Sequence, residues 1–90
     1  MTGLRLDPRL DLRAAEGLAQ GLLALRGQPL ALDAGEVRHL GGLCLQVLAS
    51  AAKTWRSDGQ RLEISSRSAE FETALATFGL PLAALEAEGA

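Results

Sequence analysis

Residues 30–56, LALDAGEVRHLGGLCLQVLASAAKTWR, decide the fold of this chain. The short apolar run Leu30 to Leu32 ends in Asp33-Ala34-Gly35, which predicts a buried strand that leaves its sheet through a turn. From Leu40 to about Arg56, apolar residues recur at steps of three and four and fall on one helix face. That face consists of Leu40, Leu43, Cys44, Val47, Leu48, Ala51 and Trp55. The stretch therefore predicts a strand followed by the main helix of the domain.

Two further elements are expected after the main helix. Leu62 to Ile64 predicts a strand, and its expected partner is the strand at Leu30 to Leu32. Ser68 can cap a last helix, since serine is a favoured residue at helix N-termini. The apolar stripe of that helix consists of Phe71, Ala74, Leu75 and Phe78. Gly79-Leu80 then ends it in the manner of a Schellman motif.

The N-terminal part is expected to add two short strands and one helix to the same sheet. Residues 4–6 and 9–12 each alternate apolar and polar side chains, with Asp7-Pro8 between them. A helix is predicted over residues 13–26, with Asp11 or a neighbour near its N-terminal cap.

The order of these elements indicates an α/β domain. Strands and helices alternate with connections of helical length, which is typical of parallel βαβ units. We expect one mixed sheet of four or five strands with three to four helices packed against it. Ninety residues suffice for one hydrophobic core, so we expect a single domain over residues 1–80. Residues 81–90 are expected to form a C-terminal tail that can add a short helical turn.

Composition argues against several classes of function. Nine Lys and Arg against eleven Asp and Glu, spread along the chain, leave no basic surface for nucleic acid or an anionic membrane. No apolar run approaches the roughly 20 residues of a membrane span, so we expect a soluble, cytoplasmic protein. One Cys and one His cannot build a zinc site of three or four ligands. With no phosphate-binding glycine loop either, we expect no metal and no cofactor.

Catalysis would have to use His39 and Cys44. His39 has Glu36 three residues before it, so a base oriented by a carboxylate is conceivable, but an exposed polar residue before a helix is the favoured interpretation. Cys44 falls among the apolar residues of the main helix, which favours a structural thiol. A small thiol enzyme therefore remains the disfavoured alternative, and it requires Cys44 to be exposed.

The main helix carries small and apolar residues outside its predicted buried face. Gly41, Leu45, Ala49 and Ala52 are predicted on its flank and outer side, where a solvated monomer usually places charge. A protein partner could dock closely on such a surface.

The arrangement resembles the STAS domain, the fold of the anti-sigma-factor antagonists. The likeness rests on residues 30–37, on residues 38–48 with their glycine pair, on the helix end at 52–59 and on the last helix at 68–80. It extends from about Leu4 to Leu80 and is closest in pattern to short bacterial members. Such members occur beside chemotaxis genes or as the soluble regulatory subunit of a lipid-transporting ABC system.

The resemblance also locates a site. In anti-sigma-factor antagonists, the loop before the main helix carries Asp-Ser-Ser-Gly or Asp-Ser-Thr-Gly, and a partner kinase phosphorylates the second hydroxyl residue. Those four positions align with His39, Leu40, Gly41 and Gly42, so only the final glycine is kept. Gly41 is thus a degenerate phosphoacceptor position, and the usual phosphorylation switch cannot operate there.

We therefore predict a non-catalytic interaction module that docks on a signalling partner such as a chemotaxis-type histidine kinase or an anti-sigma factor. The predicted partner-binding residues are Arg38, His39, Gly41, Gly42, Leu45 and Ala49. The alternative is a soluble subunit that stabilises the ATPase of a lipid-transporting ABC system. An apolar helix flank can also pair about a twofold axis, so a homodimer stays open.

Overall fold

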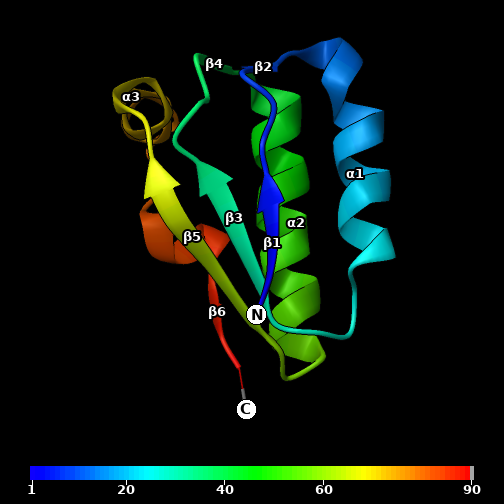
Figure 1. The fold of residues 1–90 in the computed structure, drawn as a ribbon. Helices are drawn as coiled ribbons and strands as arrows, with labels where there is room; N and C mark the ends of the chain where they lie inside the picture. The colour runs from blue at the N-terminus through cyan, green and yellow to red at the C-terminus, as the bar shows by residue number, and fades with distance from the viewer. Residues whose placement is uncertain (90) are drawn as a thin grey trace.

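The computed structural model describes residues 1–89 and contains one main sheet of mixed direction (Figure 1). Its strands are β1 (Thr2–Arg5), β3 (Leu30–Ala34), β5 (Arg61–Arg67) and β6 (Ala87–Glu88), in the spatial order β1-β3-β5-β6. β1, β3 and β5 are parallel, and β6 pairs antiparallel with β5. The α/β class and the mixed four-stranded sheet are as predicted.

The expected pairing of the two central strands is confirmed. Leu30 lies opposite Leu62, and Leu32 lies opposite Ile64. These four side chains are at most 4% exposed, so the face of β3 and β5 that carries them is buried. The register shifts after Leu32, which places Asp33 opposite Ser66.

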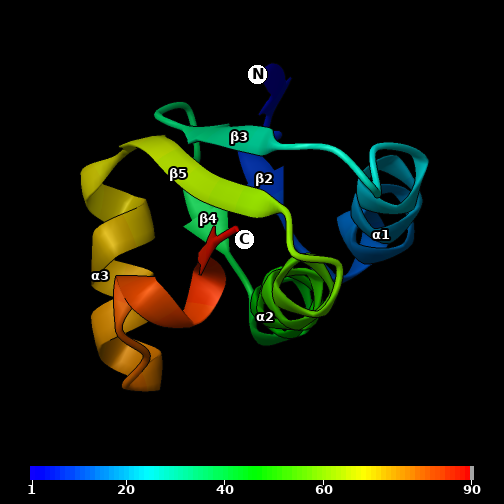
Figure 2. The same ribbon diagram turned by 90° about the horizontal axis from the view of Figure 1, so that it is seen from below.

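Three α-helices pack around this sheet. α1 (Ala15–Ala24) and α2 (Gly42–Ser57) run side by side on one side of it, and α3 (Ala69–Phe78) lies on the β5 side of the molecule, away from α1 (Figure 2). Leu48 and Trp55 of α2 are at most 1% exposed. The core therefore lies between α2 and the buried face of the sheet.

The second N-terminal strand does not join the main sheet, contrary to the prediction. β2 (Arg9–Leu10) pairs in parallel with β4 (His39–Leu40) in a separate two-stranded sheet. The carbonyl oxygen of Pro8 accepts the backbone N–H groups of Arg38 at 2.7 Å and His39 at 3.1 Å, which turns the chain away from β1. Leu40 thus belongs to β4, and α2 begins two residues later than predicted.

The first predicted helix consists of two parts. Residues Leu12–Ala14 form a 3₁₀ turn, η1, before α1 begins at Ala15. The Asp11 carboxylate caps η1, because it accepts the backbone N–H groups of Arg13 at 3.0 Å and Ala14 at 3.2 Å.

The segment after Pro81 packs on the domain. It forms the 3₁₀ turn η2 (Leu82–Leu85) and then β6, and Leu85 and Ala87 are buried. The Arg56 guanidinium of α2 donates to the carbonyl oxygens of Ala83 and Glu86 at 2.9 and 2.8 Å. Residue 90 of the predicted tail lies outside the described residues.

Trp55 is fully buried near the C-terminal end of α2, where its side chain is 1% exposed. Its indole N–H donates to the carbonyl oxygen of Gln28 at 2.8 Å, which satisfies the only polar atom of the side chain.

Ser68 joins α3 to the rest of the fold, and we predict that Ser68→Ala destabilises the protein by about 1–2 kcal/mol. Its hydroxyl accepts the Phe71 backbone N–H at 3.0 Å and donates to the Val37 carbonyl oxygen. Urea denaturation measures the loss. Thr73→Ala, at an exposed position of the same helix, is the control and should change stability by less than about 0.5 kcal/mol. Equal effects of the two substitutions would refute this role of Ser68.

Candidate functional site

The predicted site lies at the N-terminal end of α2, where β2, β4 and α3 meet (Figure 1). Gly41 precedes the helix, and its backbone N–H donates to the Leu10 carbonyl oxygen of β2 at 2.9 Å. The Cys44 thiol lies 3.3 Å from the Asp11 carbonyl oxygen. The segment from β2 to η1 is thereby held against the start of α2.

Arg38 and His39 are both exposed at this end of the molecule. The Arg38 guanidinium approaches the Glu70 carboxylate of α3 at 3.4 Å, across a shallow groove between β4 and α3. The groove is lined by Arg38, His39, Leu40, Ala69, Glu70, Thr73, Ala74, Thr77 and Phe78. The structure therefore brings Arg38, which precedes β4, and His39 of β4 next to a face of α3 that sequence reasoning did not include.

The two glycines at the start of α2 allow close packing. A β-carbon on Gly41 would lie 3.3 Å from the Leu10 carbonyl oxygen and 3.6 Å from His39 Nε2. A β-carbon on Gly42 would lie 3.5 Å from the Phe78 ring. A hydroxyl residue at position 41 would thus meet the backbone of β2, and the neighbouring carbonyl would have to shift by a few tenths of an ångström.

Leu45 is buried, which corrects its predicted place on the exposed flank. Its side chain is 2% exposed, and Ala52 is fully buried. The prediction took Leu40 as the first residue of the helical stripe, but Leu40 belongs to β4. The buried stripe of α2 instead consists of Cys44, Leu45, Leu48, Ala51, Ala52 and Trp55.

The side of α2 that carries Leu45 is covered by other elements. Gly42, Ala52 and Arg56 lie on the same side, judged by their helical spacing. Gly42 meets Phe78 of α3, and Arg56 binds the carbonyl groups of η2 and its end. The Leu45 side is therefore turned toward the interior, whereas Ala49 remains partly exposed.

Leu43 and Phe78 are exposed apolar residues at this end that the sequence analysis did not assign to the site. Leu43 is 45% exposed and Phe78 is 50% exposed. The sequence analysis assigned both to buried helix faces. Leu43 directly follows the glycine pair and Phe78 directly precedes Gly79, so each lies at a helix end, where side chains are more often exposed. We call the set Arg38, His39, Gly41, Gly42, Leu43, Ala49 and Phe78 the α2-end surface.

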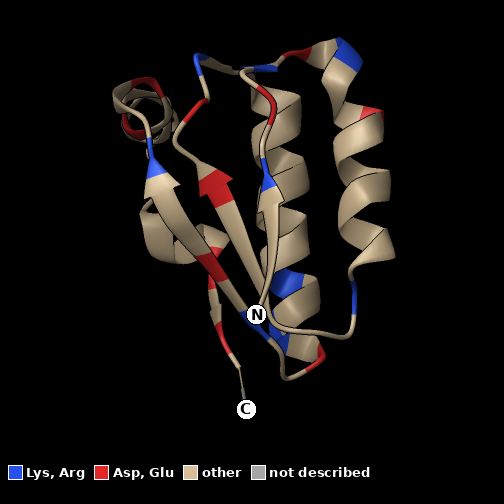
Figure 3. Cartoon of the chain, viewed as in Figure 1, with Lys and Arg blue, Asp and Glu red and all other residues tan. Residues whose placement is uncertain are grey.

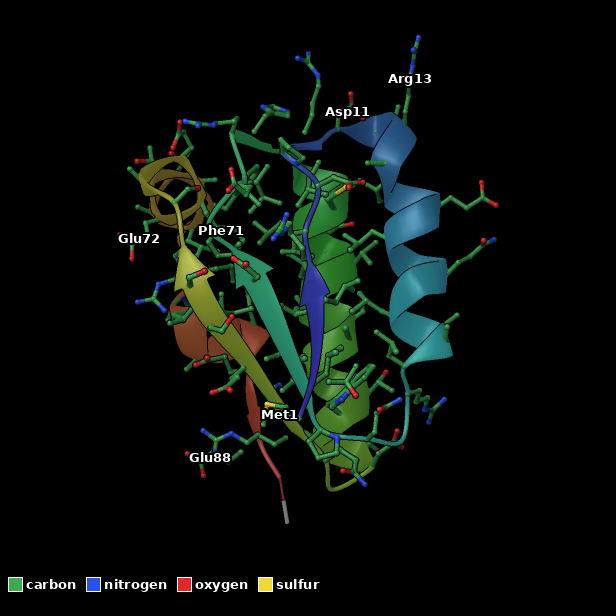
Figure 4. All side chains as sticks on the ribbon, in the orientation of Figure 1. Met1, Asp11, Arg13, Phe71, Glu72 and Glu88 are labelled. Carbon is green, nitrogen blue, oxygen red and sulfur yellow. The ribbon has the colours of Figure 1, made fainter. Side chains whose placement is uncertain are left out.

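Charges of both signs surround the α2-end surface (Figure 3). Arg9 and Asp11 form an exposed ion pair at 3.3 Å, and Arg38 and Glu70 form the other. Exposed pairs of this kind contribute little to stability. Asp11 lies beside the start of α2, and Arg13 projects away from the body of the molecule (Figure 4).

The Asp11 carboxylate is held by hydrogen bonds from the Arg9 side chain and from the Arg13 and Ala14 backbone. Partial burial raises the pKa of its carboxyl, but hydrogen bonds from the Ala14 backbone, Arg9 and the Arg13 backbone outweigh that effect, so the pKa is lowered from its ordinary value of 3.8. The charged form of Asp11 therefore stabilises the cap of η1.

Cys44 has the properties of a structural thiol. Its side chain is 1% exposed. Burial, and next the nearby Asp11 charge, raise the pKa of the thiol above its ordinary value. Both effects disfavour the thiolate, which is the nucleophilic form. Within residues 1–89, no group of three or more His, Cys, Asp or Glu side chains is placed to hold a metal ion.

We predict that the Cys44 thiol reacts with a disulfide reagent only when the protein unfolds. The reaction in buffer should be at least about 100-fold slower than in denaturing urea, because the thiol is buried and protonated. Absorbance of the released chromophore measures both rates. Fast reaction of the native protein would contradict this and would revive the enzyme alternative.

Asp11 should make stability depend on pH. Because the folded-state pKa is depressed, the stabilisation is present above the unfolded value of 3.8 and is lost as pH falls through the folded value. Asparagine caps helices equally well but carries no charge. The stability difference between wild type and Asp11→Asn, measured by urea denaturation, should therefore shrink on acidification from about pH 7 to about pH 3. A difference that is constant with pH would contradict this role.

Comparison with known proteins agrees with this architecture. Residues 1–81 match a family model described as "Mlab, STAS domain". No curated protein and no solved structure gives a significant match to the chain. Domains of this family generally bind other proteins and are generally non-catalytic. The matched region includes α1, α2 and α3 and the strands β2 and β4 beside the α2-end surface. The chain therefore belongs to the STAS domain family.

Proposed function

We propose that this protein is a non-catalytic docking module that binds a protein partner through the α2-end surface. The observation that carries the proposal is the pair Leu43 and Phe78, which are both about half exposed: Leu43 follows Gly42 in α2, and the Phe78 ring lies next to Gly42. Apolar side chains that remain exposed next to small residues give a partner both area to bury and close access to the backbone.

The composition of α2 supports docking at this end. From Gly42 to Ala52 the helix carries no charged residue, and the first charge is Lys53. A partner can therefore approach the first three turns without removing water from a charge on α2. The polar rim is supplied by Arg38, His39 and Glu70, which fits an interface with an apolar centre and a polar edge.

The environment of Gly41 supports a surface that can bind its partner without prior modification. The position lacks a hydroxyl, and the Leu10 carbonyl oxygen lies 3.3 Å from where a β-carbon would be, so a larger residue here would require a small shift of that carbonyl. Binding would therefore involve no phosphorylation at position 41. Control of binding would instead act on the partner or on the amount of this protein.

The partner we propose is a signalling protein, a chemotaxis-type histidine kinase or an anti-sigma factor. The alternative partner is the cytoplasmic ATPase of a lipid-transporting ABC system, which this protein would stabilise. Both are protein partners that would use the same surface. Within residues 1–89, no helix is both long enough and apolar enough to span a bilayer.

Affinity purification from the native cell tests the proposal with Phe78→Glu. Phe78 is half exposed, so the charge should be tolerated in the folded state but not in a desolvated interface. We expect the partner to be lost, with affinity reduced at least about 30-fold, the effect of a hot-spot residue. Mass spectrometry of the retained proteins distinguishes a kinase, an anti-sigma factor and an ATPase.

Leu23→Glu is the matched control, since Leu23 is 63% exposed on α1 and lies outside the α2-end surface. It should retain the partner, and circular dichroism should show both variants folded. Equal retention by wild type and Phe78→Glu would overturn the proposed docking surface.

A further inference from the structure

The first α-helix, α1, carries two glycines that the packing does not require. Among residues 1–89, a β-carbon added at Gly17 or Gly21 would meet no atom within 4 Å outside its chain neighbours and the backbone of the helix itself. Neither glycine has a positive φ angle, so alanine would fit at both positions. Glycine is the least favourable helix residue apart from proline. α1 therefore carries a weakness that the fold does not impose, unlike the start of α2, where Gly41 and Gly42 have close neighbours.

α1 is also thinly attached to the domain. Of its ten residues only Ala15 and Leu22 are buried, whereas α2 buries six of its sixteen. A shallow groove runs along each side of α1. One lies toward α2 and passes Leu22 and Val47, and the other lies toward β1 and passes Leu4 and Gly17. Few buried apolar side chains and an exposed backbone are the properties of segments that open at a low free energy.

Polar contacts hold both ends of α1. Before the helix, the Asp11 carboxylate caps η1. Beyond its last residue, the Arg26 guanidinium donates to both carboxylate oxygens of Asp58 at 2.8 and 3.1 Å. Asp58 directly follows α2, so this ion pair ties the end of α1 to the end of α2. The hydrogen bond from Arg26 lowers the pKa of the Asp58 carboxyl, which keeps the pair charged at neutral pH. Ion pairs that are partly exposed, as this one is, can break without unfolding a domain.

The position of α1 allows it to move without disrupting the centre of the fold. Figure 2 shows α1 at the edge of the molecule beside α2, whereas α3 and the C-terminal segment lie on the opposite side. The central contact joins Leu48 of α2 to the buried face of β3 and β5, where Leu32 and Ile64 are at most 4% exposed. These residues all lie outside α1, so opening α1 leaves their elements in place.

We propose that α1 is a hinged cover of α2, which opens by local unfolding while α2, α3 and the main sheet stay folded. The Arg26–Asp58 ion pair holds the cover closed, and Gly17 and Gly21 set how readily it opens. The cover is a property of the free protein. The inference therefore does not depend on the proposed docking of a partner, and its test needs none.

Opening the cover changes which part of α2 is accessible. Val47 and Ala51 line the groove beside α1 and would become more exposed. Leu43 lines the same groove and also belongs to the α2-end surface. The uncovered side of α2 is therefore continuous with that surface, and α1 regulates how far along the helix the accessible apolar area extends.

Hydrogen exchange of the unmodified chain, followed by NMR at several low urea concentrations, tests the inference. The backbone amides of Leu23 and Ala24 in α1 should exchange at least about 100-fold faster than that of Leu48 in α2. Their exchange should hardly depend on urea, because opening one helix exposes little surface. The Leu48 amide and those of β3 should follow the full urea dependence of global unfolding.

Two variants and one control identify the groups responsible. The double substitution Gly17→Ala and Gly21→Ala should slow exchange of the Ala24 amide about 10- to 30-fold, because alanine favours the closed helix. Asp58→Asn should speed it about two- to fivefold by weakening the ion pair. Glu63→Gln removes the carboxylate of the Arg61–Glu63 pair on β5 and should change it by less than about twofold.

Three results would overturn the hinged cover. The first is exchange of the α1 amides with the same urea dependence as the Leu48 amide, which would mean that α1 opens only when the whole domain unfolds. The second is unchanged exchange in the double glycine variant. The third is an effect of Asp58→Asn no larger than that of Glu63→Gln. None of these measurements involves Phe78 or a partner, so failure here is distinct from failure of the proposed function.

Discussion

The structure depends on the burial of one helix face against two strands. Cys44, Leu48 and Trp55 of α2 are at most 1% exposed, and they face a sheet whose Leu30 and Leu62 are fully buried. Each fully buried side chain of this size contributes about 1.5–3 kcal/mol relative to exposure. In a domain with a single core, this contact sets where α2 lies, and the position of α2 decides which residues reach the surface at its start.

The N-terminal end of α2 is then fixed by hydrogen bonds from loops. Pro8 accepts two backbone N–H groups, and Gly41 donates to Leu10, so β2 and β4 lie together over this end. Ser68 bonds to the Val37 carbonyl and caps α3, which brings Phe78 to Gly42. The α2-end surface is therefore assembled from three segments that lie far apart in the sequence, and each is held by groups that are not themselves part of it.

The sequence predicted the parts of the fold that follow from strong periodicity. The β3–β5 pair, the main helix and the capping role of Ser68 come directly from apolar spacing and residue type. A strand at residues 9–12 was predicted, but its pairing in a separate sheet was missed. The two-residue β4 has no periodic signal, and the Pro8 carbonyl that accepts the Arg38 and His39 backbone N–H groups beside it leaves no mark in the sequence pattern. That omission also affected the site prediction. With Leu40 assigned to α2, the predicted buried face of the helix included Leu43 and excluded Leu45, whereas in the structure Leu45 is buried and Leu43 is exposed.

Gly41 and Cys44 show why the surroundings of the site could not be predicted from the sequence alone. In sequence, Gly41 is only a missing hydroxyl, but in the structure it is a position where the Leu10 carbonyl comes within 3.3 Å of a β-carbon site. Cys44, one turn later, is covered by the Asp11 backbone. The segment from β2 to η1 thus packs closely against position 41, and it covers the Cys44 thiol as well. The exposed apolar groups of the α2-end surface include the Leu43 and Phe78 side chains, and Arg38 and His39 are exposed beside them, so the groups that reach the surface here are suited to contact with another molecule.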